Sequence, residues 1–141
     1  ANLPVNHIGC VGDVCATTLV AGGTLVFMDR FDPLRAVELL RHQRITWLAQ
    51  VPAQFQMLVA KAGLGPADLA GLRHLTWGGA PMPRGLIEQL SAWVPDLFNS
   101  YGLTECSGTI PVSPPGASLD VLSETVGQPV EAGLLRIAAA S

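Results

Sequence analysis

The sequence is short of charge, and of positive charge in particular. Charged residues make up 13% of the 141 residues, eight are Lys or Arg, and the net charge is −3. The basic residues are scattered along the chain instead of clustered. A protein that binds nucleic acid or an anionic membrane concentrates positive charge on one face. The composition therefore disfavours nucleic acid and membrane surfaces as partners.

Cysteine is scarce as well. The three cysteines, Cys10, Cys15 and Cys106, are odd in number and have no Cys-x-x-Cys spacing. This pattern indicates neither a disulfide framework nor a structural zinc site. We expect reduced thiols and a cytoplasmic location.

Long hydrophobic runs are missing too. The uncharged apolar stretch of residues 14–28 is interrupted by Gly22 and Gly23 and is shorter than the ~20 residues that a membrane helix needs. No Lys or Arg precedes the first apolar segment, as would be typical of a signal peptide. We therefore predict no membrane span.

The chain does contain short apolar runs that alternate with segments of helical periodicity. This order favours an α/β fold with three layers (α/β/α) and a mostly parallel sheet, followed by a short β element near the C-terminal end. Asp32 and Pro33 predict a helix start, and Gly63 and Pro95 predict helix ends. The strands that we expect are residues 24–28, 45–51, 72–79, 96–100 and 109–113, and the helices are 33–44, 52–62 and 83–94.

The alternation of strand and helix patterns ends near residue 113. We predict an α/β subdomain over residues 1–113, and a loop with the start of a β element over 114–141. Both ends of the chain are apolar and lack helix caps, which suggests a piece cut from a longer protein.

Two loops follow the third and fourth expected strands, "GGAPMP" and "YGLTE". In a parallel sheet, ligands bind beyond the carboxyl ends of the strands. Tyr101 offers a flat face for a purine ring, Thr104 a hydroxyl for a phosphoryl oxygen, and Glu105 an oxygen ligand of the kind that Mg²⁺ prefers. A Thr-Glu pair at this place is equally compatible with ordinary capping of the next helix.

The combination of "NSYGLTE" with the upstream "GGAPMP" resembles the adenylate-forming family. This family includes AMP-dependent acyl-CoA synthetases, aryl-CoA ligases, luciferases and the adenylation domains of peptide synthetases. Further segments, such as "LPVNHIGCVGD" and "ITWLAQVPAQFQMLV", are similar to the family as well, so the resemblance covers nearly the whole chain. It implies one subdomain of the family's large N-terminal domain.

The resemblance also implies site residues and ligands. His7 matches a histidine lining the passage for the acyl group and pantetheine, Thr104 would contact the α-phosphate, and Glu105 would hold Mg²⁺. The implied ligands are ATP or AMP, Mg²⁺, CoA, and a carboxylic acid of the fatty or aryl type. The residues that would line the acyl pocket and adenine site are Gly78, Gly79, Ala80, Asn99, Ser100, Tyr101 and Gly102.

Departures from the family pattern leave alternatives open. Leu103 and the pair Asn6-His7 favour a CoA ligase, whereas Asn6 and Cys106 differ from the common residues and leave the acyl substrate undefined. The alternatives are an amino-acid adenylation domain of a peptide synthetase and a non-catalytic nucleotide-binding or partner-binding module. The family's phosphate loop and late lysine have no counterpart here. We therefore expect an AMP-forming acid–thiol ligase as the parent and an isolated chain without activity.

The other histidines and Cys106 are not expected to take part in chemistry. His42 lies in the last turn of a helix, and His74 lies in an expected strand, where a histidine is more often structural than a ligand. Cys106 has no neighbouring histidine in sequence, so a nucleophilic role is not expected. The sequence contains no Gly-x-Ser-x-Gly motif of a serine hydrolase.

Overall fold

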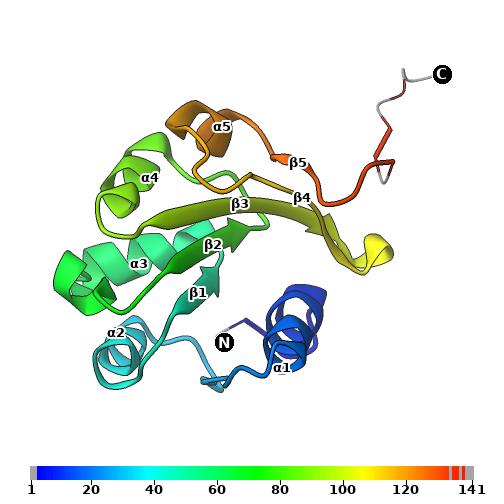
Figure 1. Cartoon of the computed structure of the whole chain (residues 1–141). Helices are drawn as coiled ribbons and strands as arrows, with labels where there is room; N and C mark the ends of the chain where they lie inside the picture. The colour runs from blue at the N-terminus through cyan, green and yellow to red at the C-terminus, as the bar shows by residue number, and fades with distance from the viewer. Residues whose placement is uncertain (1–2, 134, 137, 139–141) are drawn as a thin grey trace.

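The computed structural model describes residues 3–133, 135, 136 and 138. Within these residues it forms a five-stranded sheet in which the strands follow one another in chain order. The strands are β1 (Trp47–Gln50), β2 (His74–Gly78), β3 (Asp96–Leu103), β4 (Gly108–Val112) and β5 (Gln128–Pro129). The helices are η1 (Gly9–Ala16), α1 (Thr17–Val20), α2 (Pro33–His42), α3 (Pro52–Ala62), η2 (Pro66–Leu69), α4 (Arg84–Ser91), η3 (Thr104–Cys106) and α5 (Leu119–Glu124) (Figure 1).

The first three strands form the parallel half of the sheet. β1 pairs with β2 and β2 with β3, and α3 and α4 are the connections between them. Local signals set the helix ends as predicted: the Asp32 carboxylate accepts a hydrogen bond from the backbone N–H of Arg35 at 2.9 Å, with Pro33 in the first helical turn. Gly63 ends α3 with a φ of 62°, a left-handed conformation that favours glycine.

The last two strands form the antiparallel half. β3 pairs with β4 and β4 with β5, and the register of β3 and β4 shifts between Ser100 and Gly102. This irregularity is a β-bulge, which bends a strand and increases its twist. β3 therefore belongs to both halves: its first residues pair with β2, and its last residues form a hairpin with β4.

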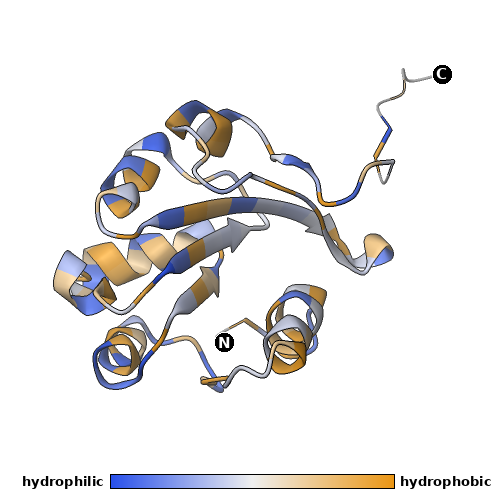
Figure 2. Cartoon of the chain, viewed as in Figure 1, coloured by the Kyte–Doolittle hydropathy of each residue, from blue (hydrophilic) through white to orange (hydrophobic). Residues whose placement is uncertain are grey.

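A single apolar cluster joins the helices to one face of the sheet. Leu75 and Trp77 of β2 and Leu97 of β3 are at most 5% exposed and pack with side chains from α2, α3, α4 and α5. Hydrophobic and hydrophilic residues alternate along α4 and α5 (Figure 2), as expected for helices with one buried side. At the surface, Arg84 of α4 pairs with Asp120 of α5 at 2.7 Å.

Helix η1 does not belong to this apolar cluster. It contacts β4 and, with α1, lies across the sheet from α4 and α5 (Figure 1). Together with the α/β order of elements, this confirms the predicted α/β class. The sheet itself is mixed, because pairing becomes antiparallel after β3.

Three local expectations were wrong. Residues 24–28 form no strand; they run beside α2 and β1 without a strand ladder. A strand requires a paired neighbour, which an apolar run alone does not supply. Residues 9–20, for which no helix was expected, are helical, and so are Leu119–Glu124, where a loop was expected. Ser118 caps this last helix through the backbone N–H of Val121 at 3.3 Å.

The C-terminal β element is short. β5 contains two residues, and the predicted continuation at Leu134 and Ile137 lies outside the described residues. The boundary between residues 113 and 114 stays a prediction. None of the helices in the described ranges is long and apolar enough to cross a membrane.

Candidate functional site

The two loops predicted to bind ligand lie side by side. In the parallel pairing of β2 with β3, Trp77 is opposite Asn99 and Gly78 is opposite Ser100. A Cβ atom at Gly78 would lie 2.9 Å from the backbone oxygen and from Oγ of Ser100, so a larger residue would push the two strand ends apart. The structure therefore brings Gly78 to Ala80 and Asn99 to Tyr101 to the same edge of the sheet.

Gly79 turns the chain away from β2. Its φ of 82° is left-handed, and this conformation is strained for residues with a side chain. Ala80, which follows, is exposed. The backbone of this loop is thus open to a ligand, because glycine leaves no side chain in the way.

Two polar side chains of the site already have partners. The Ser100 hydroxyl donates to the backbone oxygen of Trp77 at 3.0 Å. The Asn99 amide nitrogen donates to the backbone oxygen of Thr125 at 2.6 Å and to that of Leu122 at 3.4 Å. These hydrogen bonds connect β3 to β2 on one side and to α5 and Thr125 on the other.

The remaining predicted residues lie along the hairpin between β3 and β4. Tyr101 is 44% exposed, and Thr104 and Glu105 are exposed in the short helix η3. A Cβ atom at Gly102 would overlap the backbone of Gly108 on the paired strand, so this position requires glycine. The arrangement presents a ring, a hydroxyl and a carboxylate on one strand and its turn.

Glu105 is the residue predicted from the sequence to hold a magnesium ion. No group of three His, Cys, Asp or Glu side chains that would hold a metal ion occurs in residues 3–133 or in the other described positions. Mg²⁺ is commonly held by one or two carboxylates together with substrate phosphates and water. A single exposed carboxylate next to Thr104, which is predicted to contact phosphate, fits this pattern.

His7 lies on a different part of the chain. It is exposed, and its Nδ1 accepts a hydrogen bond from the backbone N–H of Gly9 at 3.0 Å, at the start of η1. Among the described residues, no hydrogen bond or ion pair joins His7 to the two loops. On the same helix, burial and the neighbouring thiol of Cys15 raise the pKa of Cys10, in line with a protonated thiol.

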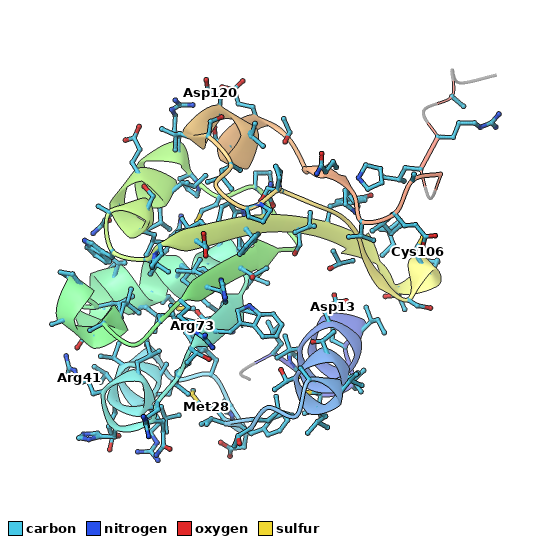
Figure 3. The ribbon with its side chains drawn as sticks, viewed as in Figure 1. Asp13, Met28, Arg41, Arg73, Cys106 and Asp120 are labelled. Carbon is cyan, nitrogen blue, oxygen red and sulfur yellow. The ribbon has the colours of Figure 1, made fainter. Side chains whose placement is uncertain are left out.

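Sequence reasoning missed Asp13 as a residue of this region. The Asp13 carboxylate accepts hydrogen bonds from the backbone N–H and from the hydroxyl of Thr109, each at 3.1 Å. Figure 3 shows Asp13 on the side of η1 that faces the hairpin carrying Cys106. One signal was available: Asp13 is the only Asp, Glu, Lys or Arg in residues 1–28.

One cavity in the described part of the chain lies away from this region. It has a volume of about 540 Å³ and is bordered by residues 23–28, α2 and β1. None of the predicted site residues lines it.

Comparison with known proteins identifies the chain's relatives. The model of a family described as "AMP-binding enzyme" matches residues 1–139. The chain is 34% identical over 104 residues to the feruloyl-CoA synthase of an Amycolatopsis species, a match that covers 74% of this chain and 21% of that protein. It is 36% identical over 112 residues to the fatty acid–[acyl-carrier-protein] ligase ScoC of Streptomyces coeruleorubidus, covering 77% of this chain and 22% of that protein.

A solved structure agrees. The o-succinylbenzoate CoA synthetase of Bacillus subtilis, in complex with its acyl-adenylate intermediate, superposes with a TM-score of 0.76 at 25% identity. The match covers 92% of this chain and 26% of that one. The chain thus spans about a fifth of the length of the curated relatives that it matches.

Proposed function

Because the chain belongs to the family of AMP-binding enzymes, we propose that the protein carrying it is an AMP-forming acid–thiol ligase, an acyl-CoA synthetase. Such an enzyme joins a carboxylate to the α-phosphorus of ATP, with release of pyrophosphate, and then transfers the acyl group from AMP to the thiol of CoA. The observation that carries the proposal is the meeting of the Gly78–Gly79 loop with the Tyr101–Glu105 hairpin at one edge of the sheet.

In this proposal the adenine and the acyl group lie at the ends of β2 and β3. The ring of Tyr101 stacks on the purine, and the backbone of Gly78, Gly79 and Ala80 lines the pocket. Through the hydrogen bonds described above, Ser100 joins β3 to β2, and Asn99 joins β3 to α5 and Thr125. Gly102 allows the backbone of β4 to lie close to that of β3.

Thr104 and Glu105 act on the phosphates. The attacking carboxylate and the triphosphate are both anionic, so charge must be offset as it builds up at the α-phosphorus. The Thr104 hydroxyl donates to an α-phosphate oxygen, and the Glu105 carboxylate holds Mg²⁺. When bound, the magnesium ion supplies positive charge to the phosphate oxygens.

The relatives also bear on which acid is activated and which thiol accepts the acyl group. The two curated relatives are named for an aryl acid and for a fatty acid, which supports a carboxylic acid of one of these types. CoA is the acceptor that we propose, with His7 beside the passage for the acyl group. ScoC, which is named for an acyl-carrier protein, supports a carrier-bound thiol as the second candidate. A cytoplasmic location stays a prediction.

The test is acid-dependent exchange of pyrophosphate into ATP by the full-length protein, with panels of aryl and fatty acids. We expect Glu105→Ala to lower the exchange rate by about 10²-fold or more, the loss typical of one charge-stabilising group. The control is Glu38→Gln, which removes an exposed carboxylate that pairs with Arg35 at 2.7 Å on α2. An unchanged rate in Glu105→Ala would overturn the role of Glu105.

A second assay separates the acceptors. After adenylation, the acyl group is offered either to CoA or to a carrier protein with its phosphopantetheine arm. Formation of acyl-CoA supports the proposal, and acylation of the carrier alone replaces it with the second candidate. Absence of exchange with every acid would contradict adenylation itself.

A further inference from the structure

We propose that Asp13 is a positioning residue, which holds the turn carrying Thr104 and Glu105 against helix η1. This role rests on the function proposed above, since it concerns the placement of the phosphate-binding residues. Asp13 itself contacts no reacting group in the proposal. It acts through the β3–β4 hairpin.

The contacts of Asp13 are long-range and specific. Its Oδ1 accepts from the backbone N–H of Thr109 and its Oδ2 accepts from the Thr109 hydroxyl, both at 3.1 Å and across 96 positions of sequence. A Cβ atom at Gly108, whose φ is 124°, would overlap Oδ1 of Asp13. Glycine at this position therefore makes room for the carboxylate.

These contacts lie at the base of the turn. Gly108 is paired with Leu103, and Thr109 with Gly102, so the two residues that meet Asp13 are opposite the last residues of β3. Between them lie η3 and Ser107, which has a φ of 63° and donates its backbone N–H to the oxygen of Thr104 at 3.1 Å. Fixing Gly108 and Thr109 thus fixes both ends of the segment that presents Thr104 and Glu105.

The link also joins the two separate parts of the predicted site. η1 begins two residues after His7, whose backbone oxygen accepts from the N–H groups of Cys10 and Val11. Asp13 is on the same helix. Through Asp13, the helix that follows His7 is attached to the hairpin that carries Glu105, although His7 has no hydrogen bond to that hairpin.

The chemistry of the link predicts which substitution is tolerated. An asparagine at position 13 can still accept from the Thr109 N–H through its oxygen. Its NH₂ group can donate to the Thr109 hydroxyl, which serves as donor or acceptor. Alanine removes both bonds. If Asp13 positions the turn, activity should therefore be retained in Asp13→Asn and lost in Asp13→Ala. If its negative charge is needed instead, both variants should lose activity.

The experiment measures acid-dependent pyrophosphate exchange by the full-length protein as a function of Mg²⁺ concentration. We expect Asp13→Ala to lower the maximal rate by about 10- to 100-fold, the range for a misplaced catalytic group, and to raise the Mg²⁺ concentration for half-maximal rate. Asp13→Asn should retain most of the rate with an unchanged Mg²⁺ requirement. Loss of activity in Asp13→Asn equal to that in Asp13→Ala would overturn the proposal, as would full activity in Asp13→Ala.

Two further variants distinguish a positioning role of Asp13 from a general folding defect. Thr109→Val keeps the shape of the side chain and removes the hydroxyl, and we expect a smaller change in the same direction. Ile87→Val destabilises the core on α4, where Ile87 is fully buried, without touching the hairpin. A rise in the Mg²⁺ requirement of Ile87→Val equal to that of Asp13→Ala would show a general loss of stability and overturn the proposal.

Failure of the proposed function gives a different result. If the wild-type protein exchanges no pyrophosphate with any acid, amide hydrogen exchange measures the link directly. Faster exchange of the Thr109 amide and its hairpin neighbours in Asp13→Ala, with unchanged exchange in β2, supports the positioning role. Unchanged exchange in the hairpin overturns it.

Discussion

The two halves of the sheet are held together by different forces. In the parallel half, β1 to β3 are covered by helices, and the apolar cluster around Phe55, Leu75 and Ile87 has side chains that are fully buried. In the hairpin of β3 and β4, Tyr101 and Leu103 are each 44% exposed, and the structure depends on the bulge, on Gly102 and on hydrogen bonds to Asp13. Stability therefore resides in the first half, and the chemistry that we propose resides in the second.

This separation has a consequence for mutagenesis. Removal of a core side chain should lower the stability of the molecule as a whole, because burial of apolar surface is the main stabilising force. A change in the hairpin should alter the site while the helices and β1 to β3 stay folded. Three further variants test this contrast, in order of decreasing expected effect.

The largest effect is expected for Phe55→Ala in α3. Phe55 is fully buried, so the substitution leaves a cavity and should lower the free energy of unfolding by about 3–5 kcal/mol. Chemical denaturation of the full-length protein measures it. Leu34→Ala in α2, at a side chain that is 66% exposed, is the control and should change stability by less than about 0.5 kcal/mol. Equal effects of the two variants would refute the assignment of the core.

An intermediate effect is expected for Gly102→Ala. The added methyl group would overlap the backbone of β4, so the bulge must open, at a cost of about 1–3 kcal/mol. Acid-dependent pyrophosphate exchange should fall more than this loss of stability explains. The matched control is Gly85→Ala in α4, where a Cβ atom meets nothing within 4 Å and alanine favours the helix. Normal exchange in Gly102→Ala would show that the hairpin tolerates displacement.

The smallest effect is expected at the ion pair of Arg41 with Asp68, at 2.6 Å in the helical part of the molecule. The hydrogen bond from Arg41 lowers the pKa of Asp68, so the pair stabilises the fold above the ordinary aspartate pKa of ~3.9. That stabilisation is lost as the pH falls through the lowered folded-state value. Wild type should therefore exceed Asp68→Asn in stability at pH 7, and the difference should shrink toward pH 3. A difference that is constant with pH would show that the charge contributes nothing.

Sequence patterns predicted the parallel half well, because its signals are local. Asp32, Gly63 and the apolar periodicity of α3 and α4 act through neighbours a few residues away. The strand expected at residues 24–28 did not form, since a strand depends on pairing with a distant segment. The reversal of direction after β3 was missed for the same reason.

For the site, the motif indicated the candidate residues but not the hydrogen bonds that hold them in place. The proximity of the two loops followed from the rule that parallel strands end at the same edge of a sheet. The sequence could not predict that the side-chain donors of Asn99 and Ser100 already have hydrogen-bond partners, because the acceptors are backbone oxygens of other elements. For the contact of Asp13 with Thr109, the one signal in the sequence is that Asp13 is the only charged residue in residues 1–28, and this does not indicate its partner.

The separation of 96 positions between Asp13 and Thr109 also bears on how the molecule folds. Contacts between distant residues require closure of a long loop and form later than local ones. During synthesis, η1 leaves the ribosome long before β4 exists, and β1, β2 and their helices can pack in the interval. The hairpin is then attached to η1 as one of the last steps, so a nascent chain would acquire the turn that we propose to bind phosphate only after its core is in place.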